Sequence, residues 1–361
     1  MTRKLIVFHT LNDYSGSPKM LATVIGGLIS NGWSVDLYTS SERGGCLSGM
    51  YGVKFHEVFY KFTKNRIITS LRFIILQFRY FFISLNYKRD RDVIFYLNTI
   101  LPFGAAIGAK LIHRKIIYHV HENPVRRNII HGIALWVMLR YADKAFFVSE
   151  YLFNSYFMEP ERKVLVPNAL MPAFSSIARD CKPEFKQPFN ILMISSLKRF
   201  KGIDIFYELS IKLPQHNFFL VLNANEDEIG NYFRNRKVPG NLSFLNATPD
   251  LHPTYRKAHL VLNLSLPDLC IESFGLTILE AMAYGIPVIV PPYGGIAELV
   301  EDGINGFKVE PGDYNMLEEK ISSIFSDKKK YSHYSANAKL MAEKFSYKVM
   351  ISRIETVIKE I

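Results

Sequence analysis

Two glutamates at a loop-to-helix junction are the residues whose types and spacing point most directly to chemistry. Glu272 and Glu280 are separated by seven residues in the segment CIESFGLTILEAMAYGIPVIVPPYGG, which begins at Cys270. Gly275 lets the backbone approach a ligand closely, and the free N–H groups at the start of the following helix form an anion site that suits a diphosphate. A helix over the eight positions from Glu272 to Glu280 rises about 12 Å. That rise roughly matches the span of a nucleotide sugar from its ribose to its hexose.

Short apolar runs alternate with amphipathic stretches along the whole chain, a pattern typical of strands and helices in parallel α/β sheets. The stretch MPAFSSIARDCKPEFKQPF contains three prolines and mixed charge and predicts a linker. Two α/β halves joined by a linker leave a cleft, and ligands of such sheets bind beyond the carboxyl ends of the strands. The strand-like runs are KLIVFHT, WSVDLYTS, DVIFYLN and KIIYHVHE before the linker, and FNILMISSL, NFFLVLNA, AHLVLNLS and PVIVPP after it.

Composition agrees with two folded domains. The chain has 361 residues, of which 48% are hydrophobic and 21% charged, enough to bury one or two sizeable cores. Its three cysteines form no CxxC or CxxxC pair, so they predict neither a disulfide framework nor a metal-ligand spacing and favour a cytoplasmic protein. The apolar run near the N-terminus is too short for a signal peptide and predicts a buried first strand.

The positive charge is concentrated in the first half. The net charge is +11, and residues 1–175 hold 22 Lys and Arg against 11 Asp and Glu, whereas the remainder holds 22 of each. Clustered cations attract polyanions, so the asymmetry indicates nucleic acid or an anionic lipid surface, with a solvated basic face as the alternative.

Residues 61–91 combine eight Lys and Arg with large apolar side chains. Arg72 and Arg79 interrupt every window long enough to span a bilayer, so we do not expect a transmembrane helix. A basic apolar helix can lie in the headgroup region of a membrane, with Arg72, Arg79, Lys88 and Arg89 on anionic lipid. The alternative is an ordinary helix whose core face is formed by apolar residues spaced by three and four, namely Ile68, Leu71, Ile75, Phe78 and Phe82.

The segment ESFGLTILEAMAYGIPVI resembles the EX7E motif of retaining GT-B glycosyltransferases, especially glycosyltransferase family 4. The later stretch GGIAELVEDGINGFKVEPGD is similar to the same family, and the resemblance covers nearly the whole chain. It implies an α/β GT-B fold, in which two Rossmann-like domains with parallel sheets face a central cleft.

The resemblance extends to the first half. Gly16 in NDYSGSPKM matches the glycine-containing loop that faces the donor phosphate, although Ser17 stands where a second glycine is common. In YHVHENP, His121 matches the histidine that lines the cleft near the reacting sugar carbon, and Glu122 follows it. We expect His119 to be packed or hydrogen-bonded.

In the second half, SSLKRFKGID resembles the segment that supplies cations to the donor diphosphate. Lys201 matches the lysine of that segment. The usual arginine falls at Ser196, which leaves the second cation to Lys198, to Arg199 or to neither. Phe244 and Leu245 fall where backbone groups hold the nucleotide base.

These matches imply His121, Lys201 and Glu272 as catalytic residues. The implied donor-binding residues are Gly16, Lys198, Arg199, Lys201, Phe244, Glu272, Ser273, Phe274, Gly275, Leu276, Thr277 and Glu280. Glu272 and the backbone around Phe274 would position the hexose, and Glu280 would hold the ribose hydroxyls rather than support packing.

The implied reaction is metal-independent transfer of a hexose with retention of configuration, and no cofactor is expected. Residues 1–175 would form the domain that faces acceptor and membrane, and residues 176–340 the nucleotide-sugar domain. Residues 341–361 would form a helix that packs back toward the first domain. The implied role is bacterial surface polysaccharide or lipopolysaccharide synthesis on a lipid-linked acceptor, at the cytoplasmic face of the plasma membrane.

Two other functions remain open from the sequence. A nucleotide-sugar 2-epimerase of the same fold would need further acid and base carboxylates in the cleft, which the sequence does not locate. A nucleic-acid-binding protein would fit the basic first half. Its aromatic residues, however, lie in apolar runs rather than alternating on an exposed sheet face, and no base-reading motif is present.

Overall fold

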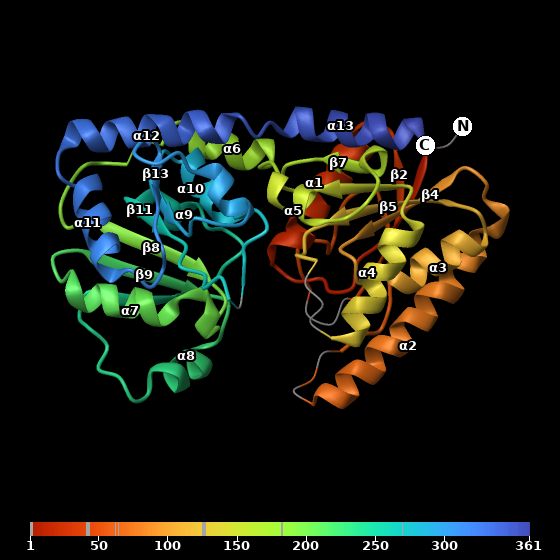
Figure 1. Cartoon of the computed structure of the whole chain (residues 1–361), viewed down its shortest axis with the longest axis horizontal. Coiled ribbons are helices and arrows are strands. Elements are labelled where there is room, and N and C mark those ends of the chain that lie inside the picture. Colours follow the sequence, from red (N-terminus) through yellow and green to blue (C-terminus); the bar gives the residue numbers. More distant parts are fainter. Residues whose placement is uncertain are drawn as a thin grey trace. The chain divides into compact units, whose positions relative to one another are not determined.

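The computed structural model describes residues 3–40, 44–61, 63, 65–124, 128–181, 183–268 and 270–361. The chain divides into two compact units: Figure 1 shows the first in red to yellow together with the blue C-terminal helix, and the second in green to blue. The first unit comprises Met1–Ala169 together with Tyr347–Ile361, and the second comprises Leu170–Ser346. The sequence places these boundaries at nearby positions, after residues 175 and 340.

Within the described residues, the first unit contains a seven-stranded parallel sheet with the order β3-β2-β1-β4-β5-β6-β7. The central strands are buried on both faces, which explains why they read as continuous apolar runs rather than as alternating ones. The strands are β1 (Lys4–Phe8), β2 (Ser34–Thr39), β3 (Val53–Glu57), β4 (Val93–Asn98), β5 (Lys115–Val120), β6 (Lys144–Phe147) and β7 (Lys163–Leu165).

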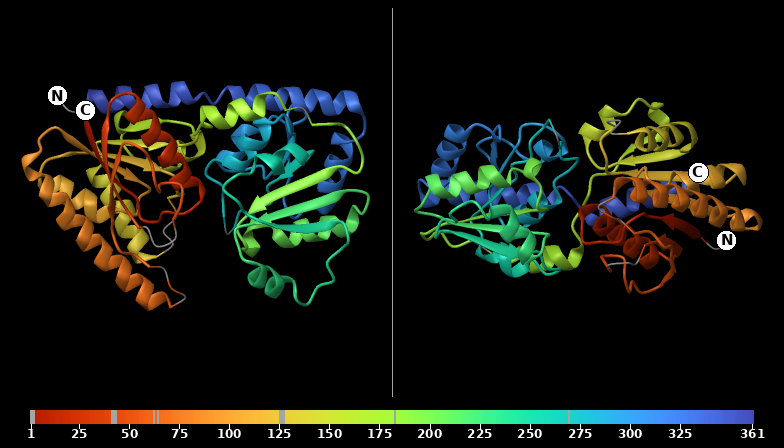
Figure 2. Two further views of the ribbon diagram at one scale, coloured as in Figure 1. Left: turned by 180° about the vertical axis from the view of Figure 1, so that it is seen from behind. Right: turned by 90° about the horizontal axis from the view of Figure 1, so that it is seen from below.

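Helices cover both faces of this sheet. Helices α1 and α13 lie on one face, and α2, α3 and α4 lie together on the other (Figures 1 and 2). The helices are α1 (Gly16–Ser30), α2 (Arg66–Leu85), α3 (Phe103–Leu111), α4 (Ile129–Tyr141), α5 (Glu150–Ser155) and α13 (Tyr347–Glu360), with 3-10 turns η1 (Asn86–Arg89) and η2 (Pro160–Arg162).

The C-terminal helix α13 is part of the first unit, far from its neighbours in the sequence. Ile351 fills the space beside Gly27 of α1, where a Cβ would lie 2.6 Å from the Ile351 Cδ1 atom. The Glu355 carboxylate accepts hydrogen bonds from Asn31 Nδ2 at 2.6 Å and from Trp33 Nε1 at 3.3 Å. These contacts fix α13 against α1 and the start of β2.

Helix α2 packs closely on α3. A Cβ at Gly104 of α3 would lie 2.0 Å from the Gln77 carbonyl oxygen, and one at Gly108 would lie 2.7 Å from that of Phe81. Only glycine permits this approach. The helical segment Ile67–Arg89 is long and apolar enough to be a candidate membrane span by length and composition, but its packing on α3 makes α2 part of the helical layer of the unit.

Within the described residues, the second unit contains a six-stranded parallel sheet with the order β10-β9-β8-β11-β12-β13. Helices α7, α8 and α11 lie on one face, and α6, α9, α10 and α12 on the other (Figure 1). The strands are β8 (Asn190–Ser195), β9 (Asn217–Leu222), β10 (Leu242–Asn246), β11 (Leu260–Leu262), β12 (Val288–Val290) and β13 (Gly306–Lys308). The helices are α6 (Pro172–Arg179), α7 (Ile203–Lys212), α8 (Glu226–Phe233), α9 (His252–Lys257), α10 (Leu276–Ala283), α11 (Tyr314–Ile324) and α12 (Lys328–Glu343), with 3-10 turns η3 (Arg199–Lys201) and η4 (Gly295–Leu299).

The predicted linker is in part a helix. Pro172 occupies the first turn of α6, where its missing N–H costs nothing. Ala178 is buried, and Lys339 Nζ of α12 donates to the carbonyl oxygen of Arg179 at the end of α6. Tertiary packing therefore stabilises a helix that proline content alone did not predict.

Candidate active site

Lys201 and Glu272 meet at the carboxyl end of the second unit's sheet. Lys201 ends the turn η3 after β8, and Glu272 lies in the loop between β11 and α10. Strands β8 and β11 are hydrogen-bonded neighbours. The parallel topology therefore brings together two side chains that are far apart in sequence.

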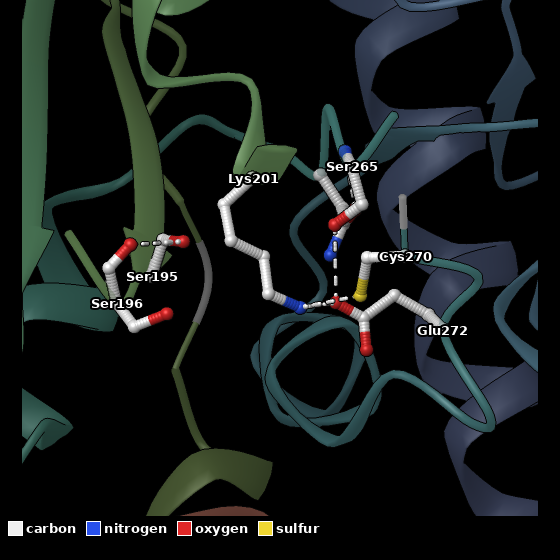
Figure 3. A network of polar contacts seen from close by, with 7 residues as sticks. Ser195, Ser196, Lys201, Ser265, Cys270 and Glu272 are labelled. Carbon is white, nitrogen blue, oxygen red and sulfur yellow. Dashed lines mark hydrogen bonds and ion pairs between the residues drawn. The ribbon is translucent and has the colours of Figure 1, made fainter. Parts of the chain in front are cut away.

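The Lys201 ammonium forms a compact polar network with this loop (Figure 3). Its Nζ forms a short ion pair with Glu272 Oε1 and donates to Cys270 Sγ at 3.4 Å. Ser265 Oγ donates to the same Glu272 oxygen at 3.1 Å. The Lys201 and Glu272 side chains are 20% and 23% exposed, so a ligand can still reach them.

The electrostatic environment keeps Lys201 charged. Burial by itself lowers the pKa of the Lys201 ammonium, but the nearby Glu272 and Cys270 outweigh burial and the net effect raises the pKa. The site therefore presents the charged Lys201 ammonium in contact with the carboxyl group of Glu272.

Two glycines allow the loops to come this close. Gly202 follows Lys201 with a φ of 78°, and a Cβ there would lie 2.2 Å from the Leu264 carbonyl oxygen. Gly294 has a φ of 80°, and a Cβ there would lie 2.5 Å from the carbonyl oxygen of Glu272. The N–H of Gly295 donates to that same oxygen at 2.9 Å, so the loop after β12 fixes the Glu272 backbone.

The start of α10 lies directly after this loop. Gly275 is the N-cap residue and, as a glycine, has no capping side chain. The N–H of Ile278 donates to the Gly275 carbonyl oxygen at 3.0 Å, so the N–H groups of Leu276 and Thr277 are the ones that can bind an anion. Phe274 is buried against Phe345, whereas Ser273, Leu276 and Thr277 are partly exposed around the helix start.

Glu280 has a structural role that the sequence interpretation did not assign. Its side chain is 1% exposed, and its Oε2 accepts a hydrogen bond of 2.7 Å from the Tyr255 hydroxyl of α9. Burial and the adjacent carboxylate raise the Tyr255 pKa well above its ordinary value, so the hydroxyl keeps its proton and donates. The expectation that Glu280 contributes nothing to packing is therefore wrong.

The two candidates for a second cation lie on the surface. Lys198 and Arg199 are both exposed, and neither forms an ion pair with another described residue. Lys198 Nζ lies 5.6 Å from the centroid of the Phe200 ring. Ser196 provides no charge, and its carbonyl oxygen accepts from the N–H of Lys198 at 2.8 Å.

The residues predicted near the nucleotide base lie on the edge strand β10. Phe244 is partly buried and packs on Phe233 of α8, with ring centroids 4.6 Å apart. Leu245 is exposed and lines two cavities, of about 600 Å³ and 170 Å³. One side of β10 therefore packs into the core, and Leu245 is available to a ligand.

His121 lies at the carboxyl end of the first unit's sheet, immediately after β5. Its Nε2 lies 3.0 Å from Asn98 Oδ1 at the end of β4. Burial, together with the neighbouring His119 and His9, lowers the His121 pKa well below its ordinary value. His119 is fully buried and bonds the Tyr96 hydroxyl through Nδ1 at 2.7 Å.

Glu122 and Gly16 lie at the same edge of the sheet. The Glu122 carboxylate accepts from the N–H groups of Ile100 and His121, and burial raises its pKa to about 7. Gly16 begins α1, and a Cβ there would meet no described atom within 4 Å. The protein itself therefore does not require a glycine at this position.

The basic segment has its apolar face outside. On α2, Ile68, Leu71 and Ile75 are 42%, 57% and 45% exposed, and Phe78 and Phe82 are 63% and 62% exposed. The alternative in which these five residues form the core face is wrong. The opposite face of the helix is buried instead, through Phe73, Leu76, Gln77, Tyr80 and Ser84.

The four basic residues predicted to bind a membrane differ in their contacts. Arg72 Nη1 donates to the Lys61 carbonyl oxygen at 3.2 Å, and Arg79 Nη1 donates to that of Phe59 at 3.3 Å. These two side chains tie down the segment before α2. Lys88 and Arg89 are exposed on η1, and none of the four forms an ion pair within the part of the chain that the structure describes.

Four polar residues at these sites were not found from the sequence. Ser265 and Cys270 contact the Lys201–Glu272 pair, Tyr255 holds Glu280, and Asn98 holds His121. Asn98 is the last residue of an apolar strand, a position that could have identified it, since polar residues at strand ends gather at one edge of a parallel sheet.

Comparison with known proteins identifies the second unit. Residues 176–341 match the family model described as glycosyl transferases group 1. The match covers most of the second unit and a little under half of the chain. The predicted resemblance to glycosyltransferases is thereby confirmed.

Individual relatives match parts of the chain. A sucrose synthase of Melioribacter roseus is 38% identical over 93 residues, which cover 24% of this chain and 12% of that protein. A poly(glycerol-phosphate) alpha-glucosyltransferase of Bacillus subtilis is 25% identical over 210 residues, which cover 56% of this chain and 31% of that protein. The chain thus matches a minor part of each relative's length.

A solved structure matches the whole chain. Anabaena HepE in complex with UDP and glucose superposes with a TM-score of 0.79 at 18% identity, and the match covers 99% of this chain and 100% of that one. The two Rossmann-like units with parallel sheets, predicted as the GT-B fold, are confirmed.

Replacing Glu280 tests both contacts that we assign to it. In Glu280→Ala the Tyr255 hydroxyl loses its buried acceptor, and we expect the free energy of unfolding to fall by about 1–3 kcal/mol. We also expect weaker binding of nucleoside diphosphates, because the carboxylate would hold the ribose. Urea unfolding and calorimetric titration with UDP, GDP and ADP measure the two effects.

Two further variants control this experiment. Glu280→Gln keeps an acceptor for Tyr255, so it should retain more stability than Glu280→Ala while still binding nucleotide weakly. Glu319→Ala removes an exposed carboxylate of α11 and should change neither quantity. If folded Glu280→Ala binds nucleotide as tightly as the parent, Glu280 does not hold the ribose hydroxyls.

Proposed function

We propose that this chain is a glycosyltransferase that moves a hexose from a nucleotide-sugar donor to an acceptor hydroxyl. The observation that carries the proposal is the contact between Lys201 and Glu272 beside the uncapped start of α10, within a group 1 glycosyltransferase domain. An ammonium and a helix N-terminus attract a diphosphate, and a carboxylate accepts hydrogen bonds from sugar hydroxyls. The UDP and glucose bound to the similar Anabaena structure support this class of donor.

Leaving-group stabilisation is the task that we assign to Lys201. As the glycosidic bond breaks, negative charge grows on the diphosphate and the anomeric carbon gains oxocarbenium character. Glu272 orients the Lys201 ammonium through their ion pair, so little reorganisation is needed when the phosphates arrive. Lys201 and the α10 N-terminus supply the positive field, and the reaction is metal-independent.

The proposed stereochemical course is retention. The acceptor attacks the face that the diphosphate leaves, Glu272 and the backbone near Phe274 position the hexose, and Glu280 holds the ribose. His121 contacts the sugar as a neutral polar group, because burial and its histidine neighbours keep its pKa low. No residue is assigned as a covalent nucleophile.

Sugar transfer from a panel of radiolabelled nucleotide sugars to lipid-linked glycan acceptors tests the activity. We expect transfer from one donor class, and about a hundredfold lower turnover in Lys201→Ala, since one electrostatic contact to developing charge is worth roughly 3 kcal/mol. Lys198→Ala and Arg199→Ala test whether either residue supplies the second cation, and Lys329→Ala, which removes an exposed cation of α12, is the control.

Three outcomes of this assay would contradict the proposal. Turnover of Lys201→Ala within twofold of the parent would remove the role of Lys201. Release of a 2-epimer of the donor sugar, without transfer, would favour the epimerase. Tight binding of nucleic acid with no activity on any nucleotide sugar would favour the third function.

The transfer reaction should persist in EDTA. The positive charge at the diphosphate comes from Lys201 and the start of α10, so removing divalent cations should leave the initial rate within about twofold. The rate is measured before and after dialysis against EDTA, with Mg²⁺ or Mn²⁺ restored in a parallel sample. A rate that disappears in EDTA and returns with metal would overturn the metal-independent mechanism.

We further propose that the first unit binds the cytoplasmic face of the plasma membrane through α2 and η1. The apolar side chains that the structure leaves exposed on α2 supply an insertable surface, with Lys88 and Arg89 beside it for anionic headgroups. On the same side of the sheet, α4 exposes Ile129, Ile133 and Trp136. Tryptophan is favoured at membrane interfaces.

A membrane-bound acceptor follows from this surface. An enzyme held at the membrane meets acceptors that are themselves anchored in lipid, so the acceptor is a lipid-linked glycan in bacterial surface polysaccharide or lipopolysaccharide synthesis. Poly(glycerol-phosphate) alpha-glucosyltransferase, which matches over 56% of this chain, is the relative that supports a polymeric acceptor.

Vesicle sedimentation tests the membrane assignment. The protein should sediment with vesicles containing anionic phospholipid, leave neutral vesicles largely unbound, and be partly released by high salt. Each cation near an anionic surface contributes about 1 kcal/mol, and inserted apolar side chains add a contribution that salt does not screen.

Two double variants distinguish the contribution of the cations to membrane binding from that of the inserted apolar side chains. Lys88→Glu with Arg89→Glu should weaken sedimentation, and Phe78→Ser with Phe82→Ser should weaken it even at low salt. Arg72 and Arg79 are left intact in these variants because they hold neighbouring backbone. Phe157→Ser removes a phenylalanine that is 95% exposed outside α2 and is the control. If both double variants sediment as fully as the parent, α2 and η1 are not the membrane-binding surface.

A further inference from the structure

Asn98 connects three segments at the carboxyl edge of the first unit's sheet. It ends β4 between β1 and β5 and is fully buried. Its amide Nδ2 lies 3.2 Å from the Ser17 carbonyl oxygen of α1 and 3.1 Å from Nδ1 of His9, which follows β1. Its Oδ1 lies 3.0 Å from His121 Nε2 after β5.

The Ser17 contact fixes which way the Asn98 amide faces. A backbone carbonyl oxygen can only accept a hydrogen bond, so the Asn98 atom that contacts it must be the NH₂ group. The amide oxygen is then the atom that faces His121. The reverse orientation would place the Asn98 amide oxygen against the Ser17 carbonyl oxygen, with no proton between them.

The amide orientation in turn fixes the imidazole. An amide oxygen accepts only, so His121 must carry a proton on Nε2. Burial and the adjacent histidines hold the pKa of His121 well below its ordinary value, so the ring is neutral and Nδ1 is unprotonated. Among the described residues, no polar atom bonds to this nitrogen.

We propose that Asn98 is a positioning residue that fixes His121 with its proton on Nε2, so that Nδ1 offers a lone pair to a hydroxyl group of the sugar substrate. The proposal rests on the proposed glycosyl transfer and adds a selectivity to it. A lone pair accepts from a hydroxyl and repels a phosphate oxygen, so His121 recognises the sugar and not the diphosphate.

Several titratable groups surround His121, and each bears on its charge. The His119 ring lies 4.4 Å away between centroids, and His9 reaches Asn98 from β1. Burial lowers the pKa of His9 to about 4 and that of His119 to about 3, so both are neutral at pH 7. Glu122 follows His121 and titrates near pH 7, and Asp13 acts on His9.

Nitrogen NMR of the full chain with labelled histidine tests the tautomer without any assay of activity. The His121 signals, assigned by their loss in His121→Gln, should show protonated Nε2 and unprotonated Nδ1, with no titration between about pH 5.5 and 8. A proton on Nδ1, or titration of the ring within this range, would overturn the proposal. The result stands whether or not sugar transfer is observed.

Asn98→Asp tests the consequence for function. A carboxylate beside His121 favours the imidazolium, which donates from both nitrogens and cannot accept at Nδ1. Relative to the parent at each pH, the variant should lose about tenfold in kcat/KM between pH 8 and pH 6 while its UDP affinity stays unchanged. Taking the ratio to the parent removes the titration of Glu122, which both proteins share.

Asn65→Asp is the matched control, because it adds one negative charge to an exposed cap of α2 in the same unit and keeps the capping oxygen. Its kcat/KM should follow the parent at every pH. If kcat/KM of folded Asn98→Asp falls by the same factor at all pH values, Asn98 has a structural role only and the proposal is overturned. If Asn98→Asp does not fold, the NMR result on the parent decides.

Discussion

An ammonium and a carboxylate in contact at the carboxyl end of a parallel sheet are the centre of this structure. The Lys201–Glu272 pair is largely shielded from water, and each charge tolerates this only because the other is beside it. The pair in turn requires two close backbone approaches, at Gly202 and Gly294, and the hydrogen bond from Gly295 to the Glu272 carbonyl. The loops after β8, β11 and β12 thus form one preorganised surface.

The first unit has neutral histidines, rather than an ion pair, at the carboxyl edge of its sheet. It places three histidines at the carboxyl edge of its sheet, where burial lowers their pKa values and keeps them neutral. Asn98 contacts one ring nitrogen each of His9 and His121, and Tyr96 contacts one of His119. On its outer side, α2 turns one apolar face into the core and leaves a second one exposed beside exposed cations. The neutral polar edge and the amphipathic outer face are the basis on which we propose that the first unit contacts sugar and lipid, and the charged pair is the basis of the phosphate site proposed in the second unit.

The motif spacing was sufficient to predict the fold and the loop-to-helix junction that follows Glu272, because strand length, helix period and turn glycines are local properties. The spacing was not sufficient to predict which side chains are buried or where α6 forms, because tertiary contacts determine both. The face of α2 that packs inward depends on glycines of α3, which permit contact with Gln77 and Phe81, and spacing by three and four fits either face. Likewise, the buried state of Glu280 depends on Tyr255 from a separate helix, and α6 forms inside a proline-containing segment because α10 and α12 lie beside it.

Calorimetric titration of the nucleoside diphosphate alone tests the central claim most directly, because it involves neither acceptor nor chemistry. If the Lys201 ammonium binds the diphosphate, Lys201→Ala should weaken the affinity by about 10- to 100-fold, the range for hydrogen bonds to charged groups. Glu272→Gln should bind the nucleotide at least as tightly as the parent, since it removes a negative charge that competes for Lys201. Parent-like affinity in Lys201→Ala, or lost affinity in folded Glu272→Gln, would contradict the assignment of this pair as the donor site.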